Sequence, residues 1–209
     1  MMTTNNPAAT RRKMVFFSLA NTPEKAVNCV RISIVLSALF FIISCGGEPA
    51  EVKTYTKDGF TMTIPGGWRA TEDSYQIWGT RFLSFDAVDD AIVNVEIYTA
   101  ENVQDLKEEN NFDLQKLVTQ YNRFSDSFLV AATEKSEPVF REISRLGLNG
   151  IEQSGSAAFV DIDASYVKEF YLVTQKSGEA FFVAIEMSPD EHKLMNQDID
   201  LFLSRLMEN

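Results

Sequence analysis

Alternating apolar and polar residues predict several β-strands in the first half of the chain. Residues 59–64 have the sequence GFTMTI, in which apolar positions alternate with threonines, as in a half-buried strand. Two further strands are predicted at 80–85 and 91–100, with the acidic bend DAVDD between them. The Val93, Val95 and Ile97 side chains share one face of the later strand, and we expect that face to be buried.

A tight turn is predicted after the first of these strands. Proline presets φ and glycine tolerates positive φ, so Pro65 and Gly66 fit the two central positions of a type II turn. The turn would bring Trp68 back onto the core.

The period changes to that of an amphipathic helix at residues 113–128. Its apolar positions are Leu114, Leu117, Val118, Tyr121, Phe124 and Phe128. The polar stretch from Glu108 to Asn110 is interpreted as the entry to this helix.

The second half of the chain predicts two hairpins and a closing helix. Asn149-Gly150 lies between β-prone runs and is typical of a type I′ hairpin turn. A second hairpin joins residues 166–175 to 180–188. The closing helix begins at about Pro189, after Ser188 as N-cap. One face of it carries His192, Met195, Ile199, Phe202, Leu203 and Leu206.

This order of elements predicts an α+β fold, an antiparallel sheet flanked by helices. The opening GFTMTIPGGW, the middle helix, the hairpins and the closing helix resemble the PsbP-like superfamily across Tyr55 to Met207. The resemblance implies an α/β/α sandwich. It also implies a binding or assembly function, because the family is mostly non-catalytic. The family has no universal catalytic residues that could be assigned to positions in this sequence.

An apolar run near the start of the chain predicts an export signal. Residues 32–44 are apolar apart from two serines, and Arg31 precedes them. A membrane-spanning helix needs about 20 apolar residues, whereas a signal peptide needs only about 7–15. The last residues, Ile42 to Cys45, resemble a bacterial lipobox, which implies a diacylglycerol on the Cys45 thiol and usually a further acyl chain. The alternative is an ordinary apolar segment that happens to end in cysteine.

The expected division is a leader at 1–44, a lipidated tether at 45–54 and a globular domain at 55–209. The leader is long for a signal peptide, which favours a start at Met14 or Val27. We expect a lipid-anchored protein of the cell envelope, on the outer membrane facing the periplasm if the host has two membranes.

The charge of the mature chain restricts its partners. After removal of the leader, 14 of 19 Lys and Arg and 29 of 30 Asp and Glu remain, a net charge of −15. Such a chain repels nucleic acid and anionic lipid headgroups. Lipid on Cys45, rather than a basic patch, would therefore attach the protein to the membrane. Cys29 lies in the leader, which leaves no cysteine pair for a disulfide.

The chain carries little of the chemistry that catalysis needs. His192 is the single histidine, and its place among apolar helix positions predicts a packed or rim residue. No nucleophile motif or phosphate-binding loop occurs. We therefore expect no catalytic residues and no cofactor.

Metal-binding candidates are weak. Asp86 and Asp90 lie in DAVDDAIVNVEI, which lacks the glycine and the terminal glutamate of a calcium loop. Asp161 and Asp163 share one side of a predicted strand, where solvated carboxylates are the favoured interpretation. The aromatic residues Tyr75, Trp78 and Tyr98 line either a groove or the core.

The predicted function is a non-enzymatic accessory or binding module that meets a protein partner. The alternative is an assembly factor for a membrane complex; a hydrolase or a metal-binding protein is less favoured. A binding module should expose apolar side chains, whereas an enzyme should have a deep pocket with convergent polar groups.

Overall fold

The computed structural model describes residues 51–76, 79–125, 134–159 and 162–208. One compact unit spans Pro49–Asn209. The leader, Cys45, Trp78, Phe128 and Asp161 lie outside the described residues, and the predictions made for them stay predictions.

An eight-stranded antiparallel sheet forms the centre of this unit. In spatial order its strands are β3 (Arg69–Tyr75), β4 (Arg81–Asp86), β5 (Ile92–Tyr98), β10 (Ala180–Met187), β9 (Ile162–Thr174), β8 (Leu148–Phe159) and β6 (Glu134–Lys135), with β7 (Val139–Arg145) also paired to β8. A separate antiparallel pair is formed by β1 (Val52–Lys57) and β2 (Phe60–Pro65).

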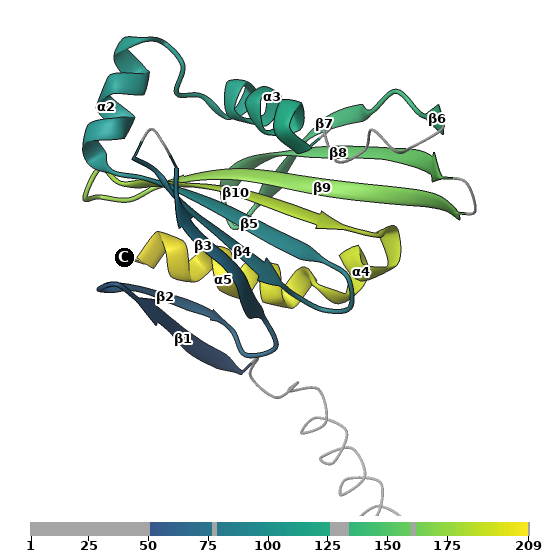
Figure 1. Ribbon diagram of the computed structural model, residues 1–209, viewed down its shortest axis with the longest axis horizontal. Coiled ribbons are helices and arrows are strands. Elements are labelled where there is room, and N and C mark those ends of the chain that lie inside the picture. Colours follow the sequence, from purple (N-terminus) through teal and green to yellow (C-terminus); the bar gives the residue numbers. More distant parts are fainter. Residues whose placement is uncertain (1–50, 77–78, 126–133, 160–161, 209) are drawn as a thin grey trace, which may run out of the picture. The chain divides into compact units, whose positions relative to one another are not determined.

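Helices cover both faces of the sheet (Figure 1). One face carries α2 (Ala100–Glu108) and α3 (Leu114–Ser125), and the other carries α4 (Pro189–Leu194) and α5 (Asn196–Glu208). The β1–β2 pair packs against α5. The predicted α+β class, an antiparallel sheet flanked by helices, is therefore confirmed.

The central strands of the sheet are buried on both faces, and two apolar clusters result. In β10, Phe181, Val183 and Ile185 face α5, whereas Phe182 and Ala184 face α2 and α3. Alternate residues of a strand point to opposite faces, so a central strand between two helical layers must be apolar throughout. The predicted burial of Val93, Val95 and Ile97 is also confirmed.

Trp68 is fully buried, as predicted, but the turn before it differs from the prediction. The Trp68 amide donates to the Pro65 carbonyl over 3.1 Å, which makes Gly66 and Gly67 the central residues. Neither glycine has a positive φ, so this is not the expected type II turn at Pro65-Gly66. Gly66 instead lies close to Glu51, where a Cβ would be about 3.0 Å from the Glu51 side chain.

The first hairpin of the second half turns three residues earlier than predicted. Leu146 and Gly147 are its central residues, with φ of 54° and 81°, as a type I′ turn requires. Asn149 and Gly150 lie inside β8, paired with β7. The prediction of a turn at Asn149-Gly150 was wrong because Gly150 serves a packing role there.

The closing helix is two helices in the structure. Ser188 caps α4 in a capping box with Glu191, which confirms the predicted N-cap. Met195 then separates α4 from α5. Ile199, Phe202, Leu203 and Leu206 are buried as predicted. Because both pieces keep one apolar face, their pattern predicted a single helix.

Four elements were not predicted: α2, β3, β1 and the two-residue strand β6. The helix α2 begins at Thr99, whose side chain forms a capping box with Asn102. Glu108 therefore ends a helix, and the interpretation of Glu108 to Asn110 as a helix entry was wrong. The strand β3 has mostly polar residues, and β1 begins at Val52, within the stretch expected to be tether.

Candidate binding pocket

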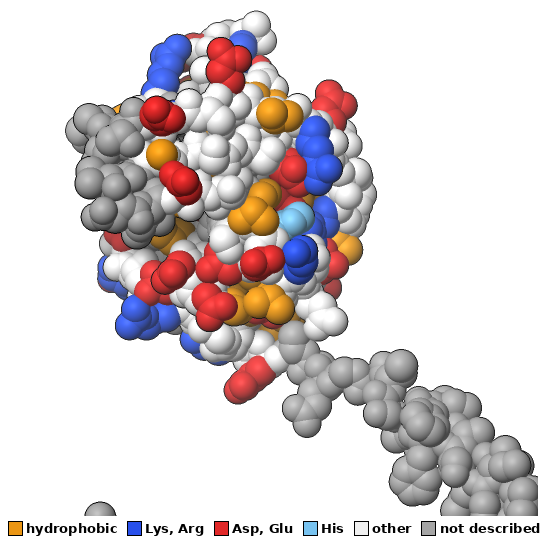
Figure 2. Space-filling model, turned by 90° about the vertical axis from the view of Figure 1, so that its right-hand side faces the viewer, with side chains coloured by type: hydrophobic (Ala, Val, Ile, Leu, Met, Phe, Trp, Pro, Cys, Tyr) orange, Lys and Arg blue, Asp and Glu red, His pale blue; other side chains and the backbone are white. Residues whose placement is uncertain are grey.

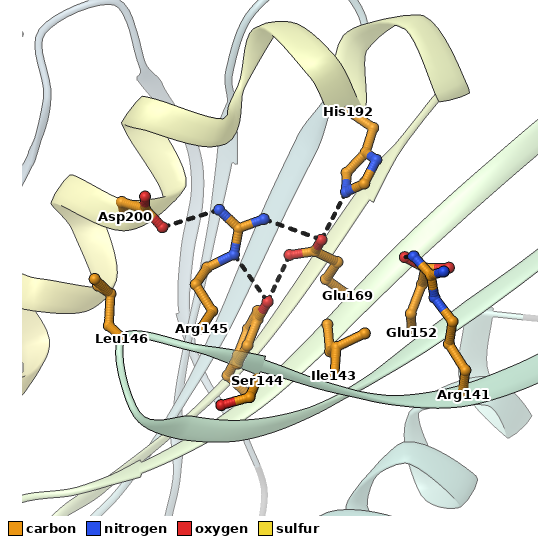
Figure 3. Close-up of a pocket in the computed structure, with 10 residues that line it drawn as sticks. Arg141, Ile143, Ser144, Arg145, Leu146, Glu152, Glu169, His192 and Asp200 are labelled. Carbon is orange, nitrogen blue, oxygen red and sulfur yellow. Dashed lines mark hydrogen bonds and ion pairs between the residues drawn. The ribbon is translucent and has the colours of Figure 1, made fainter.

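A polar pocket opens on the α4–α5 side of the sheet, next to β7, β8 and β9 (Figure 3). Its volume is about 380 Å³. It is lined by Arg141, Ile143, Ser144, Arg145, Leu146, Glu152, Glu169, Tyr171, His192 and Asp200. Convergent polar groups of this kind were the feature expected of an enzyme.

The strand register places charged side chains in one row across three strands. Arg141 of β7 pairs with Glu152 of β8, which in turn pairs with Glu169 of β9. Because residues two apart on a strand share a face, Ile143 and Arg145 lie on the same side as Arg141. Three neighbouring strands thus deliver two carboxylates and two guanidinium groups to the pocket.

Glu169 is the buried centre of this row, with 2% of its surface exposed. One carboxylate oxygen, Oε1, lies 2.7 Å from His192 Nε2 and 3.2 Å from Arg145 Nη2. The other oxygen accepts a hydrogen bond from the Tyr171 hydroxyl over 2.6 Å. A buried carboxylate is costly unless its oxygens are paired, and here both are.

Arg145 ties the β7–β8 hairpin to α5. Its guanidinium donates to Asp200 over 2.9 Å and to the backbone and side-chain oxygens of Asn196 over 3.2 and 2.8 Å. Burial alone would lower the pKa of Arg145, but the hydrogen bond to Asp200 and the charge of Glu169 outweigh it and raise that pKa. The residue is a fixed positive charge between the sheet and the helix.

Tyr171 occupies space that Gly150 leaves open. A Cβ at Gly150 would lie 2.6 Å from the Tyr171 ring and 3.0 Å from Ile143. Because Gly150 has no Cβ, the Tyr171 ring can lie over β8. Its hydroxyl then forms hydrogen bonds with Glu169 and Arg145. Burial, followed by the charge of Glu169, raises the pKa of Tyr171, so the hydroxyl remains a hydrogen-bond donor.

Glu152 is paired less firmly than Glu169. Its carboxylate accepts from Arg141 over 2.6 Å. The Glu152 side chain is 9% exposed, but the Arg141 side chain is 63% exposed and extends into solvent. The pair thus joins a buried anion to a cation that water reaches easily.

His192 reaches this row from α4 and lies at the pocket rim, with 25% of its side chain exposed. Figure 2 shows the single histidine at the surface among acidic, basic and hydrophobic side chains. The rim position agrees with the prediction from its helical spacing. Its carboxylate partner was not predicted, because no sequence pattern links Glu169 to His192.

The weak metal candidates named from the sequence do not form a site together. Asp86 pairs with Arg69 at 2.5 Å, and Asp90 and Asp163 are exposed. Among the described residues, the acidic and histidine side chains close enough to hold one ion are instead Glu152, Glu169 and His192.

The aromatic residues considered as a binding groove lie in different places in the structure. Tyr75 is exposed, whereas Tyr98 is buried against α2 and α3, so these two line no common groove. Trp78 is outside the described residues.

A second buried ion pair lies near the β1–β2 layer. Arg81 donates two hydrogen bonds to Asp73, over 2.8 and 2.6 Å, and the Tyr55 hydroxyl donates a further one. These hydrogen bonds, that of Arg81 above all, outweigh burial and lower the pKa of Asp73 to about 2. The cluster joins β1, β3 and β4, and it belongs to the framework rather than to the pocket.

Comparisons with known proteins found distant similarity to solved structures. No protein-family model matches it, and no curated protein matches its sequence significantly. The solution structure of cyanobacterial PsbP from Synechocystis is similar over 77% of this chain and 94% of its own, at 13% identity and a TM-score of 0.40. The PsbP-like resemblance stays an expectation from the sequence.

Two further solved structures are similar at lower scores. LpqN of Mycobacterium tuberculosis, described as involved in cell envelope biogenesis, is 12% identical over 78% of this chain and 85% of its own, with a TM-score of 0.33. A Pseudomonas aeruginosa protein of unknown function, described as a putative regulator, is 10% identical over 73% and 94%, with a TM-score of 0.30. Likenesses this distant do not transfer a function.

In the described part of the chain, no helix has the length and apolar character needed to cross a bilayer.

Proposed function

We propose that this chain is a lipid-anchored, non-enzymatic accessory protein of the cell envelope that binds a partner protein along the outer edge of β7. The lipobox-like Ile42 to Cys45 supports the anchor, and lipid on Cys45 would hold the acidic domain at a membrane surface that its own charge does not favour. In a host with two membranes, the place would be the periplasmic side of the outer membrane.

The observation that carries the binding proposal is the exposed edge strand β7. Within the described residues, β7 pairs with β8 and with no other strand. Val139, Phe140 and the turn residue Leu146 are 65%, 47% and 50% exposed. An open strand edge with exposed apolar side chains supports docking of an extended segment, whose backbone would continue the sheet.

The polar pocket supports binding better than catalysis. Both Glu169 oxygens are occupied by donors. Among the described residues that line the pocket, Ser144 is the only serine or threonine, and it lies away from His192 in Figure 3. Strand alternation explains this, because Ser144 points to the opposite face from Arg145. A Ser–His pair, which nucleophilic hydrolysis would need, is therefore not formed here.

Site-specific photo-crosslinking in native membranes tests the docking proposal. A photoreactive amino acid at Val139 should give one discrete adduct, and the same amino acid at Leu194 should not. Leu194 is a matched control because it is also 65% exposed and lies on α4. Adding Phe140→Lys to the Val139 probe should abolish the adduct, because an edge lysine opposes strand addition.

Two results would overturn the proposal. One is the absence of any discrete adduct from Val139 in membranes where the chain is abundant. The other is the same adduct from both positions, or an adduct from Val139 that persists with Phe140→Lys.

A further inference from the structure

We propose that Glu152, Glu169 and His192 form a binding site for one divalent transition-metal ion, with Zn²⁺ as the ion of best fit. The three residues come from β8, β9 and α4, and one ligand atom of each lies within 4.8 Å of the others. The proposal concerns the purified chain alone and is independent of docking at β7.

The two carboxylates supply a reason for a cation at this point. Glu152 and Glu169 are direct cross-strand partners, and both are buried. Like charges directly opposite each other on a sheet repel, and burial strengthens that repulsion. A divalent ion between them would turn this repulsion into attraction.

The charges around the pocket leave an excess of anions. Glu152, Glu169 and Asp200 face the pocket with Arg141 and Arg145. Arg145 is held by five hydrogen bonds, to Glu169, Tyr171, Asn196 and Asp200, and none of them goes to Glu152. Arg141 is mostly exposed, so an ion can displace it from Glu152 at little cost.

One ligand pair is already close to the spacing of a metal site, whereas the three ligand atoms together lie within 4.8 Å and must draw nearer to hold one ion. His192 Nε2 and Glu169 Oε1 are 2.7 Å apart, in hydrogen-bond contact. Two ligands of a tetrahedral Zn²⁺ lie roughly 3.4 Å apart, so this pair must separate by less than about 1 Å. His192 is at the rim of the pocket, and Figure 3 shows its ring nitrogen directed at Glu169 from outside the sheet.

The donor set selects the class of ion. One imidazole nitrogen and two carboxylate oxygens suit Zn²⁺ and related transition metals. Ca²⁺ and Mg²⁺ prefer six or more oxygen ligands, which this cluster lacks. The pocket of about 380 Å³ gives an ion access and leaves room for water as a fourth ligand.

Titration of the full chain in detergent, purified without a histidine tag, tests the site. Zn²⁺ should bind with a stoichiometry of one and raise the melting temperature. Co²⁺ should give the visible absorption of a low-symmetry, nitrogen- and oxygen-bound ion. His192→Gln and Glu152→Gln should each weaken Zn²⁺ binding by more than about tenfold. Glu142→Gln, an exposed carboxylate on β7, should leave it unchanged.

Arg141→Met supplies a second, independent test. Methionine cannot compete for Glu152, so this variant should bind Zn²⁺ more tightly than the native chain does. Its exposed position makes loss of folding a minor concern. Absence of saturable binding at one site would overturn the proposal. So would Zn²⁺ binding that survives both His192→Gln and Glu152→Gln, or that does not tighten in Arg141→Met.

Discussion

Glu152 and Glu169 face each other directly across β8 and β9, and both carboxylates are buried. Each has its own arginine: Arg141 contacts Glu152, and Arg145 contacts Glu169. Both arginines lie on β7, four residues apart and therefore on one face. The edge strand is thus held to the sheet by charge as well as by backbone pairing.

Glu169→Gln should lower the free energy of unfolding by about 1–3 kcal/mol, because it leaves buried donors of Arg145 and Tyr171 without full pairing. Urea unfolding with a chelator present measures this without a contribution from bound metal. Glu142→Gln, on an exposed side chain of β7, should change it by less than about 0.5 kcal/mol. Equal effects of the two changes would show that the buried cluster contributes nothing specific.

Gly150→Ala should destabilise the fold by about 1–3 kcal/mol, because the new Cβ would overlap the Tyr171 ring and Ile143. Gly67→Ala is the matched control, since its Cβ would meet nothing within 4 Å and its φ is not positive. Thermal unfolding of both variants measures the difference. A Gly150→Ala variant as stable as Gly67→Ala would contradict the packing role.

The spacing of apolar residues predicted much of this fold, because the burial of one face of a strand or helix determines that spacing directly. The alternation of Val93, Val95 and Ile97 and the helical spacing of Ile199 and Phe202 both follow from an apolar core. The strand β3 escaped prediction because its polar residues include Asp73, whose partner Arg81 makes burial possible. A pairing between separate strands leaves no local pattern in the sequence.

The pocket could not be predicted from the sequence for a related reason. Glu152, Glu169 and Arg145 look like surface residues along the chain, and only the register of β7, β8 and β9 joins them. Gly150 was misleading in a different way. The same absence of a side chain suits a turn and also suits close packing of a ring, and only the tertiary structure separates the two.

Phe202→Ala should cost about 3–5 kcal/mol of unfolding free energy, because it removes a fully buried ring from the contact with Trp68. The two ring centroids are 4.9 Å apart. Leu194→Ala, on an exposed side chain, should cost less than about 1 kcal/mol. Denaturant unfolding followed by tryptophan fluorescence compares them, and similar midpoints would contradict the assigned core.

Asp73 should contribute stability that depends on pH. Its side chain is 5% exposed, and the hydrogen bonds from Arg81 help to lower its pKa from 3.8 to about 2. A lowered carboxyl pKa stabilises the folded state above the unfolded pKa, and this contribution is lost as pH falls from about 4 to about 2. Asp73→Asn should therefore cost about 2 kcal/mol near neutral pH.

The difference in unfolding free energy between Asp73→Asn and the native chain should shrink as the pH falls from about 4 to about 2. Unfolding curves measured from pH 7 to pH 2 would record this change. Asp86→Asn is the control, because the Arg69–Asp86 pair is largely exposed and contributes less than about 1 kcal/mol. A difference that stays constant with pH would contradict the assignment to ionised Asp73.

The anchor at Cys45 is the central claim of the proposed function, and the mass of the mature N-terminal peptide tests it most directly. The chain would be isolated from membranes of its own host, beside a Cys45→Ser variant. We predict a mature chain that begins at Cys45 and carries diacylglycerol on the thiol, and a Cys45→Ser form that is unprocessed or soluble. A native chain without lipid on Cys45, or a Cys45→Ser chain that keeps its lipid, would contradict the account.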